Sequence, residues 1–298
     1  MDNNERKILK RDLKEKRELV NIEIDRFLPR KDEFPKQIHK AMRHTLFAGG
    51  KRLRAYLMIN AYRLFDENIS QTFIVAGAIE MLHTYTLIHD DLPAIDNDDI
   101  RRGRKSCHVV YGDDIALLAG DALLVSAFEA ISLAELDERL KIQLIAELSK
   151  ESGSTGLIGG QVVDIMSEGK KVSKKTLEYI HKNKTARLIN LPIRFACYLA
   201  KASNEDQKRL EEFGSKLGLA FQIVDDILDV EGDESTLGKT IGKDSNVEKA
   251  TFPAIYGLEK SRDMATKLIE EAKTLLQPYG DKGKMLSLLS EYVLTRKV

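Results

Sequence analysis

Apolar residues recur along this chain at the spacing of one helix face, and the strict alternation of a strand is hard to find. The pattern predicts long helices over residues 69–92, 114–133, 173–201 and 205–229, with further helix near the C-terminus, where Leu and Ile alternate with Lys and Glu. Several of these segments are apolar nearly all round, as helices in the middle of a large bundle are. We therefore expect an all-α fold.

Capping residues and prolines predict where two of these helices begin and end. Ser70 and Ser173 can each accept a hydrogen bond from the backbone of the turn that follows. Pro93 should stop or kink the first helix near Leu92, because proline lacks a backbone N–H. Pro192 should kink the helix that Ser173 opens.

The lack of linkers and the balance of charge limit how the chain can be divided into domains and which partners it can bind. No internal repeat, low-complexity tract or Pro/Ser-rich linker divides it, so we expect residues 1–298 to form one domain. The chain carries 47 Lys and Arg against 47 Asp and Glu, a formal net charge of +0. That balance removes a general attraction to polyanions, and we expect no nucleic acid partner.

The same composition bears on the compartment. Cys107 and Cys197 are the only cysteines, too few for a disulfide scaffold and compatible with a reducing cytosol. The N-terminal segment is charged throughout and lacks the apolar core of a signal peptide. Glu80, Asp121 and Glu129 interrupt the most apolar stretches. We therefore expect a cytoplasmic protein without stable membrane insertion.

An aspartate cluster forms the end of the apolar segment over residues 205–229. Asp225 and Asp229 are one helical turn apart and only about 40° apart around the helix, with Asp226 beside them. Two carboxylates at that spacing repel each other unless a cation lies between them. Hard oxygen ligands suit Mg²⁺, which prefers to share its coordination sphere with water and phosphate oxygens.

A second cluster, Asp90, Asp91 and Asp96, follows another apolar helix. On an ideal helix Asp96 would lie about 120° away from Asp90, so the two could not bind one ion together. A kink at Pro93 could bring Asp96 back beside Asp90.

Acidic runs at helix ends are usually solvated faces or caps, so either cluster alone is a weak indication of function. Two of them, each directly after strongly apolar helix, are harder to explain in that way. Charge that follows an apolar stripe without a polar transition indicates a helix end facing a partly buried cavity. The pair therefore favours a site for metal and phosphate.

Basic residues that could bind a diphosphate lie before and within the first apolar helix. Gly50 precedes a predicted helix on which Lys51 and Arg54 would share one face. His83 is on the stripe of Asp90, about 10 Å along the helix, although a hydrogen-bonded core histidine is the alternative.

Further cations follow the first acidic cluster and recur later in the chain. Arg101 and Arg102 could reach two different phosphate groups, because the guanidinium group suits bidentate recognition of oxygen. Lys184, Lys239 and Lys243 are weaker indications, since each alone is typical of a surface.

Taken together, the motifs resemble those of the trans-isoprenyl diphosphate synthase family, over nearly the whole chain. The matching segments are GGKRLR, IHDDLPAIDNDDIRRGRKSCH, GLIGGQVVDI, NKT, FQIVDDILD, LGKTIGKD and KATFP. The DDLPA form of the first acidic motif is similar to the bacterial farnesyl diphosphate synthase subgroup.

The resemblance implies a single bundle of helices around a deep central cavity, usually a homodimer. It implies an enzyme that uses Mg²⁺ and condenses isopentenyl diphosphate with an allylic diphosphate, dimethylallyl or geranyl. The steps would be ionisation of the allylic diphosphate, attack by the double bond of isopentenyl diphosphate, and loss of a proton.

It also implies a role for each matching residue. The metal ligands would be Asp90, Asp96 and Asp225. Residues supporting that site would be Asp91, Asp226 and Asp229. The allylic diphosphate would contact Arg101, Lys184, Thr185, Gln222 and Lys239. Isopentenyl diphosphate would contact Gly50, Lys51, Arg54, His83 and Arg102. Of these, the catalytic set would be Asp90, Asp91, Asp96, Arg101, Lys184, Asp225 and Lys239.

Product length is expected to depend on Tyr85 and Thr86, which precede the first aspartate in the positions that govern pocket depth in the family. A bulky Tyr85 resembles farnesyl diphosphate synthases, whereas Asn97 occurs also in longer-chain relatives, so a geranylgeranyl diphosphate synthase remains the alternative. A terpene cyclase would have no use for GGKRLR and Arg102. A non-catalytic synthase subunit often lacks one acidic motif, and this chain has both.

Overall fold

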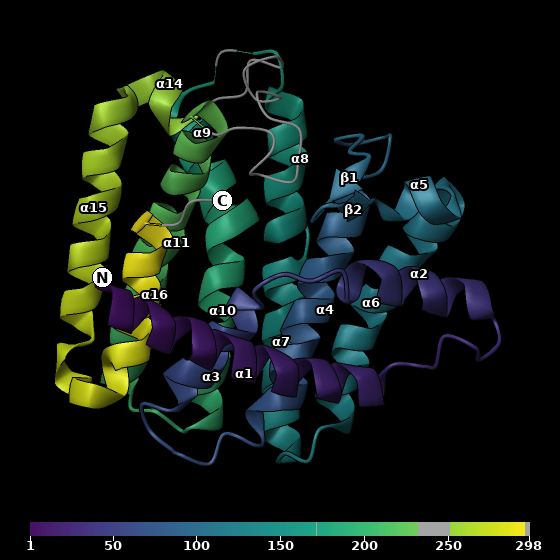
Figure 1. Cartoon of the computed structure of the whole chain (residues 1–298), viewed down its shortest axis with the longest axis horizontal. Helices are drawn as coiled ribbons and strands as arrows, with labels where there is room; N and C mark the ends of the chain where they lie inside the picture. Colours follow the sequence, from purple (N-terminus) through teal and green to yellow (C-terminus); the bar gives the residue numbers. More distant parts are fainter. Residues whose placement is uncertain (171, 232–250, 296–298) are drawn as a thin grey trace.

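Helices make up nearly all of the computed structural model, which describes residues 1–170, 172–231 and 251–295 (Figure 1). The N-terminal half contains α1 (Asn3–Phe27), α2 (Lys36–Leu46), α3 (Leu53–Tyr62), α4 (Thr72–Asp90), β1 (Ile100–Arg101), β2 (Arg104–Lys105), α5 (Cys107–Tyr111), α6 (Asp113–Leu133) and α7 (Glu138–Ser152). The remainder contains α8 (Leu157–Ser167), α9 (Lys174–Ile180), the π-helical turn η1 (His181–Ala186), α10 (Arg187–Leu199), α11 (Asn204–Glu231), α14 (Phe252–Tyr256), α15 (Leu258–Leu275), the 3₁₀ turn η2 (Gln277–Gly283) and α16 (Lys284–Thr295). The predicted all-α fold is confirmed.

Helix boundaries follow the apolar pattern closely at two of the predicted segments, because α6 and α11 match 114–133 and 205–229 within a few residues. Ser173 does cap α9, accepting a hydrogen bond from the Thr176 backbone N–H at 3.1 Å. Ser70 does not cap α4, because its hydroxyl donates to the Asn68 side chain at 2.8 Å instead.

The expected helix over 173–201 is divided in the structure. Regular α-helical winding is interrupted at η1, His181–Ala186, and resumes in α10. Pro192 lies inside α10, which continues past it to Leu199. The change of winding therefore comes before the proline, at the NKT motif.

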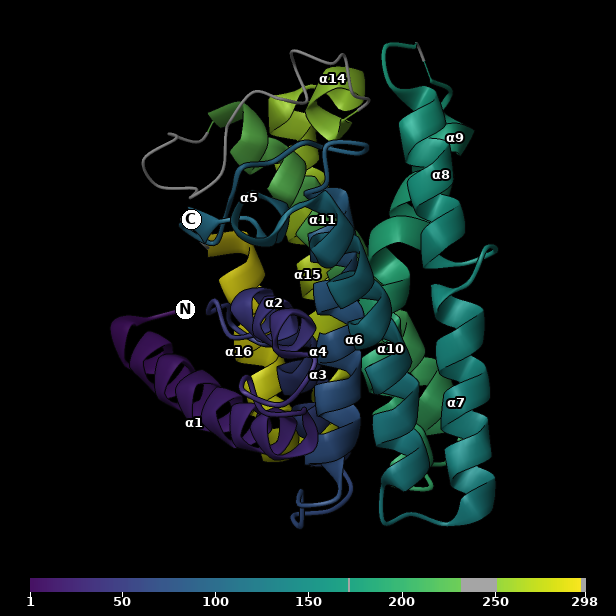
Figure 2. The ribbon, with the colours of Figure 1, turned by 90° about the vertical axis from the view of Figure 1, so that its right-hand side faces the viewer.

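The core sits where α4 and α6 run side by side through the middle of the bundle, with α1 and α2 on one side and α7 and α8 on the other (Figure 2). Most residues of α4 from Val75 to Leu82 are fully buried, in agreement with a helix that is apolar on nearly all sides. The C-terminus of α4 is directed toward the end of the bundle that also carries β1, α9 and α14 (Figure 1).

One helix in the described part of the chain, α6, is long and apolar enough to cross a membrane by length and composition. In its most apolar window, 44% of the residues are buried inside the structure. That helix packs against α2, α4, α5 and α7, as a core helix of a bundle does.

Candidate active site

A cavity of about 490 Å³ lies between α3, α4, α6, α8 and the start of α10. Its polar end carries charged and titratable side chains, namely Arg54, His83, His89, Asp90, Asp121 and Lys184. Its walls are mostly apolar and include Leu124, Leu157, Ile158, Val162, Ile165 and Leu188. The cavity therefore combines charged and apolar side chains in its lining.

The first acidic motif forms the part of the rim where α4 ends. Helix α4 ends at Asp90, and the chain then folds back so that the Asp96 N–H donates to the Asp90 carbonyl at 2.9 Å. The Asp98 N–H makes the equivalent bond to the Asp91 carbonyl at 3.2 Å. Asp96 does return beside Asp90, through a tight loop after the helix rather than a kink within it.

Electrostatics at Asp90 are unfavourable for a second negative charge. Burial raises the pKa of the Asp90 carboxyl to about 6, Lys184 and Arg101 act against the shift, and Asp96 adds to it. A buried carboxylate beside a like charge lowers its free energy when it acquires a cation. Asp90 and Asp96 are therefore suited to share a divalent ion.

Asp91, the next residue, points to a different partner. Its side chain is buried, and Arg101 Nε donates to its Oδ1 at 2.8 Å, while the same guanidinium donates to Asp98 at 3.2 Å. Burial of the guanidinium lowers the pKa of Arg101, but the hydrogen bond to Asp91 and the charges of Asp91, Asp98 and Asp90 together raise it. Asp91 thus orients Arg101, which remains protonated beside the motif.

Arg101 and Arg102, which follow the first acidic motif, belong to a two-stranded hairpin. Arg101 is in strand β1, and Arg102 is in the turn. Strands β1 and β2 pair Ile100 with Lys105, and the turn between them has Arg102 and Gly103 at positive φ of 54° and 71°. Positive φ at both positions is the geometry of a type I′ turn. Arg101 therefore faces Asp91, and Arg102 extends to the Gly49 carbonyl, which it reaches at 2.9 Å.

Gly50 permits the approach of Arg102. A Cβ on this glycine would lie 2.8 Å from the Arg102 Cζ, and Gly50 itself has a φ of +97°. A side chain at this position would displace the guanidinium group and strain the backbone. Gly50 thus makes room for the Arg102 guanidinium group.

The prediction that Lys51 and Arg54 share one helix face is wrong. Helix α3 begins after Arg52, whose φ of +50° is left-handed, so Lys51 lies before the helix. The buried carboxylate of Glu80 determines that start, because it pairs with Arg52 at 3.4 Å and accepts from a backbone N–H of the first turn. Lys51 instead places its Nζ 5.0 Å from the centroid of the Tyr292 ring.

His83 is buried in the lining of the cavity. Its Nδ1 has no hydrogen-bond partner in the described part of the chain, so the alternative of a hydrogen-bonded core histidine fails at this atom. Burial lowers the pKa of His83 well below its usual value, and the charges of Arg54 and Arg102 lower it further. A buried imidazole between two guanidinium groups is suited to hydrogen-bond an anion.

The second acidic motif lies on α11, whose uninterrupted winding keeps Asp225 and Asp229 one turn apart. The charge of Asp225 raises the pKa of Arg54, although burial lowers it more. Arg54 and Asp90 line the cavity, and Asp225 is near enough to Arg54 for its charge to act there. Asp226 accepts hydrogen bonds from the Gln222 amide at 2.8 Å and from the backbone N–H at the start of α14 at 2.9 Å. This carboxylate therefore connects α11 with α14.

Lys184 is brought to the cavity by η1. Its Nζ donates to Asp164 Oδ2 at 2.6 Å, and the charges of Asp164 and Asp90 raise its pKa in spite of burial. Sequence reasoning missed Asp164 as a functional residue, although it stands in the GLIGGQVVDI motif. Lys239 and the side chain of Thr185 lie outside the described residues.

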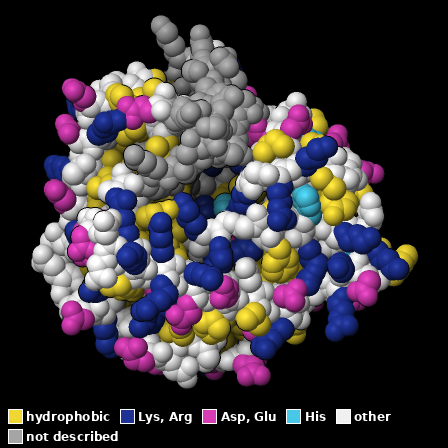
Figure 3. Space-filling view, viewed as in Figure 1, with side chains coloured by type: hydrophobic (Ala, Val, Ile, Leu, Met, Phe, Trp, Pro, Cys, Tyr) yellow, Lys and Arg dark blue, Asp and Glu magenta, His cyan; other side chains and the backbone are white. Residues whose placement is uncertain are grey.

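No three His, Cys, Asp or Glu side chains within residues 1–170, 172–231 and 251–295 gather closely enough to enclose a metal ion. The three predicted ligands, Asp90, Asp96 and Asp225, are therefore not drawn together around one point in this structure. Lys and Arg side chains gather around a hollow on the face seen in Figure 3, as a diphosphate would require.

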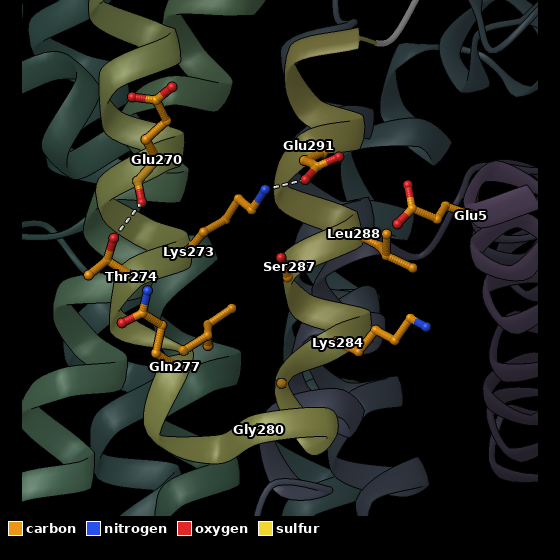
Figure 4. A pocket seen from close by; sticks show the side chains of 12 residues that line it. Glu5, Glu270, Lys273, Thr274, Gln277, Gly280, Lys284, Ser287, Leu288 and Glu291 are labelled. Carbon is orange, nitrogen blue, oxygen red and sulfur yellow. Dashed lines mark hydrogen bonds and ion pairs between the residues drawn. The ribbon is translucent and has the colours of Figure 1, made fainter. Parts of the chain in front are cut away.

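A second cavity, of about 510 Å³, lies between α15, α16 and the start of α1 (Figure 4). An ion pair between Lys273 and Glu291 crosses it, and Thr274 and Ser287 point into it from the two helices. The lining of this second cavity contains neither acidic motif. Lys273, its principal cation, already has a carboxylate partner in Glu291.

Comparison with known proteins shows the family of the chain. The family model described as polyprenyl synthetase matches residues 35–288. Farnesyl diphosphate synthase from Geobacillus stearothermophilus is 40% identical over 288 residues, covering 95% of this chain and 96% of that protein. The large subunit 1 of a chloroplastic heterodimeric geranylgeranyl pyrophosphate synthase from Arabidopsis thaliana is 44% identical, covering 95% and 78%.

A solved structure shows the same architecture. The Helicobacter pylori geranyltransferase, complexed with magnesium and isoprenyl diphosphate, superposes with a TM-score of 0.83 at 32% identity, covering 94% of this chain and 97% of that one.

The raised pKa of Asp90 predicts the effect of its neutralisation. The folded pKa, about 6, exceeds the usual 3.8, so the folded state holds the proton more tightly and stability falls as pH rises between those values. In metal-free protein we expect Asp90→Asn to stabilise the fold by up to about 3 kcal/mol at pH 8, with a smaller gain at pH 5. Urea unfolding at both pH values measures this difference.

The matched control is Asp263→Asn, on the exposed face of α15, which should change stability little at either pH. An Asp90→Asn variant no more stable than wild type at pH 8 would contradict the account of Asp90.

Proposed function

Because this chain belongs to the polyprenyl synthetase family of prenyltransferases, we propose that it condenses isopentenyl diphosphate with dimethylallyl and then geranyl diphosphate to give farnesyl diphosphate. The observation that carries this proposal is the cavity itself. Charged groups that suit diphosphate and Mg²⁺ line the same cavity as apolar side chains that suit a prenyl chain.

Binding of the allylic diphosphate would use both acidic motifs. Mg²⁺ would be held by Asp90, Asp96 and Asp225, and when bound it would neutralise charge on the departing diphosphate. Arg101 and Lys184, each already oriented by an aspartate, would add fixed positive charge at the same group.

Isopentenyl diphosphate would bind at the other side of the rim. Arg54 and His83 line the cavity together, and the charges of Arg54 and Arg102 both lower the pKa of His83. Lys51 and a backbone N–H of Gly50 would complete the subsite.

The reaction needs no protein base. Ionisation breaks the allylic carbon–oxygen bond and leaves a carbocation, which the double bond of isopentenyl diphosphate attacks to form a carbon–carbon bond. The proton lost in the last step passes to the released diphosphate. Water would quench the cation, and side chains such as Leu124 and Leu188 exclude it from the well.

Product length is the finer part of the proposal. Tyr85 and Thr86 both line the cavity, and the Tyr85 ring meets the His89 ring edge-on at 5.4 Å between centroids. A ring held in that way narrows the space beneath Asp90, which supports a fifteen-carbon product. The Arabidopsis relative is named for geranylgeranyl pyrophosphate, and a twenty-carbon product is the second candidate.

Two other functions have weaker support. A terpene cyclase would need no site for isopentenyl diphosphate, so product formed without that substrate would identify one. A non-catalytic subunit would show no activity when the purified chain is assayed alone.

The proposal treats residues 1–298 as one cytoplasmic domain. Both cysteines are free and buried, which is compatible with a reducing compartment.

We propose that the working form is a homodimer that pairs through α6. Leu117, Leu118, Val125 and Leu133 of that helix are between 45% and 67% exposed, and Ile142 of the neighbouring α7 is 68% exposed. Leu118 and Val125 are seven residues apart and so lie only about 20° apart around α6. Large exposed apolar side chains that share a face are typical of an interface.

The metal-ligand assignment predicts that Asp225→Ala and Asp90→Ala each lower kcat on the order of 100-fold or more, because they remove charge stabilisation that matters mainly in the transition state. Steady-state turnover with geranyl and isopentenyl diphosphates measures this loss, and thermal unfolding checks that each variant folds. Near-normal turnover in both variants would refute the assignment.

The role of Tyr85 predicts that Tyr85→Ala shifts the products to longer chains by deepening the well. Chromatography of the products formed from dimethylallyl and geranyl diphosphates measures the distribution. Tyr85→Phe keeps the ring and should leave the products unchanged. An unaltered fifteen-carbon product from Tyr85→Ala would remove Tyr85 from the account.

The dimer predicts that Val125→Glu, which places a charge on the apolar face of α6, converts the protein to a monomer in sedimentation equilibrium. Phe34→Glu is the control, because Phe34 is 88% exposed in the loop between α1 and α2. A wild-type chain that sediments as a monomer would favour a heteromeric enzyme instead.

A further inference from the structure

A buried ion-pair network joins α7 to α10 outside the cavity. The Glu151 side chain is only 3% exposed, and two arginines hold it, Arg187 at 2.8 Å and Arg194 at 3.1 Å. Arg194 also pairs with Glu147 at 2.9 Å. None of these four residues lines the cavity, and the reaction proposed above uses none of them.

Arg187 makes one contact that Arg194 does not make. Arg187 Nε donates to Asn183 Oδ1 at 2.7 Å, and the Asn183 amide donates in turn to the Tyr179 carbonyl at 2.8 Å. Asn183 is buried and precedes Lys184 within η1. The network therefore reaches from Glu151, through Arg187, to the residue next to Lys184.

The turn η1 is confined on its other side by α8. A Cβ at Gly160 would lie 2.5 Å from the Lys184 backbone nitrogen and 2.9 Å from the Asn183 carbonyl carbon. Helix α8 thus packs directly against the backbone that carries Lys184, and Arg187 binds the same turn through Asn183. The backbone of Lys184 is held from two directions.

A π-helical turn needs such support, because it is rarer and less favourable than α-helix and occurs often at functional sites. Its extra residue matters for direction: each residue of winding turns a side chain by about 100° around the helix axis. With the turn in place, the Lys184 ammonium meets Asp164 and acts on Asp90 and Asp96.

We propose that Arg187 is a positioning residue that holds the π-helical turn through Asn183 and so presents Lys184 to the allylic diphosphate. Glu151 orients Arg187, and Arg194 neutralises the remaining charge of Glu151. This inference rests on the proposed role of Lys184 in the allylic subsite.

Arg187→Ala and Arg194→Ala make a matched pair, because each removes one guanidinium group from the same buried carboxylate. We expect Arg187→Ala to raise the KM for geranyl diphosphate about tenfold or more, as loss of a well-placed charge contact would, and to leave the KM for isopentenyl diphosphate within about twofold. Arg194→Ala should lower the unfolding midpoint to a similar extent and keep both KM values near wild type. Equal kinetic effects of the two variants would overturn the proposal.

Asn183→Ala provides a second variant that leaves the ion pair between Glu151 and Arg187 intact. It should reproduce the KM pattern of Arg187→Ala. A normal KM for geranyl diphosphate in a folded Asn183→Ala protein would overturn the proposal as well.

A double-mutant cycle separates this inference from the function beneath it. Lys184→Ala should raise the KM for geranyl diphosphate, and Arg187→Ala should add little in that background. If Lys184→Ala has no effect, the proposed role of Lys184 fails and the inference fails with it. If Lys184→Ala has its effect but the two changes multiply independently, the role of Lys184 stands and the positioning role of Arg187 is overturned.

Discussion

The structure depends on two like charges that are partly buried at the end of an apolar helix. Asp90 ends α4 inside the protein, Asp96 returns beside it, and burial holds the Asp90 pKa near 6. Such a pair is costly without cations. Arg101 and Lys184 supply positive charge, and each is itself anchored by an acid outside the pair, Asp91 and Asp164 respectively. The cations are therefore oriented before any anion arrives, so binding has less side-chain entropy to overcome.

The apolar well follows from the same helices. Because α4 and α6 are apolar on nearly all sides, they can pack on neighbours and still line a cavity with the residues left over. Thr86 lies one helical turn before Asp90. Its hydroxyl already has a partner, because it donates to the His83 carbonyl at 2.7 Å. A satisfied hydroxyl demands no water, and the region below the charged rim stays suitable for a prenyl chain.

Features that follow from local helix geometry could be predicted from the sequence. Features that depend on tertiary contacts were missed. The spacing of Asp225 and Asp229 followed from helix geometry alone, and α11 has that geometry. The shared face of Lys51 and Arg54 failed because Glu80, distant in sequence, determines where α3 begins. The pairing of Lys184 with Asp164 was equally out of reach, since periodicity assumes regular winding.

The loops that carry the two N-terminal motifs also contain unusual backbone conformations. Among the described residues other than glycine, positive φ occurs at Arg52, Asn97, Arg102 and Lys201, and all except Lys201 lie in the loops of the two N-terminal motifs. Each such residue costs free energy that the surroundings must offset. Arg52 is held by Glu80, and Arg102 by the Gly49 carbonyl. The acids and carbonyls around the rim thus stabilise unusual backbone as well as charge, and this links the position of the cations to the folding of the loops that carry them.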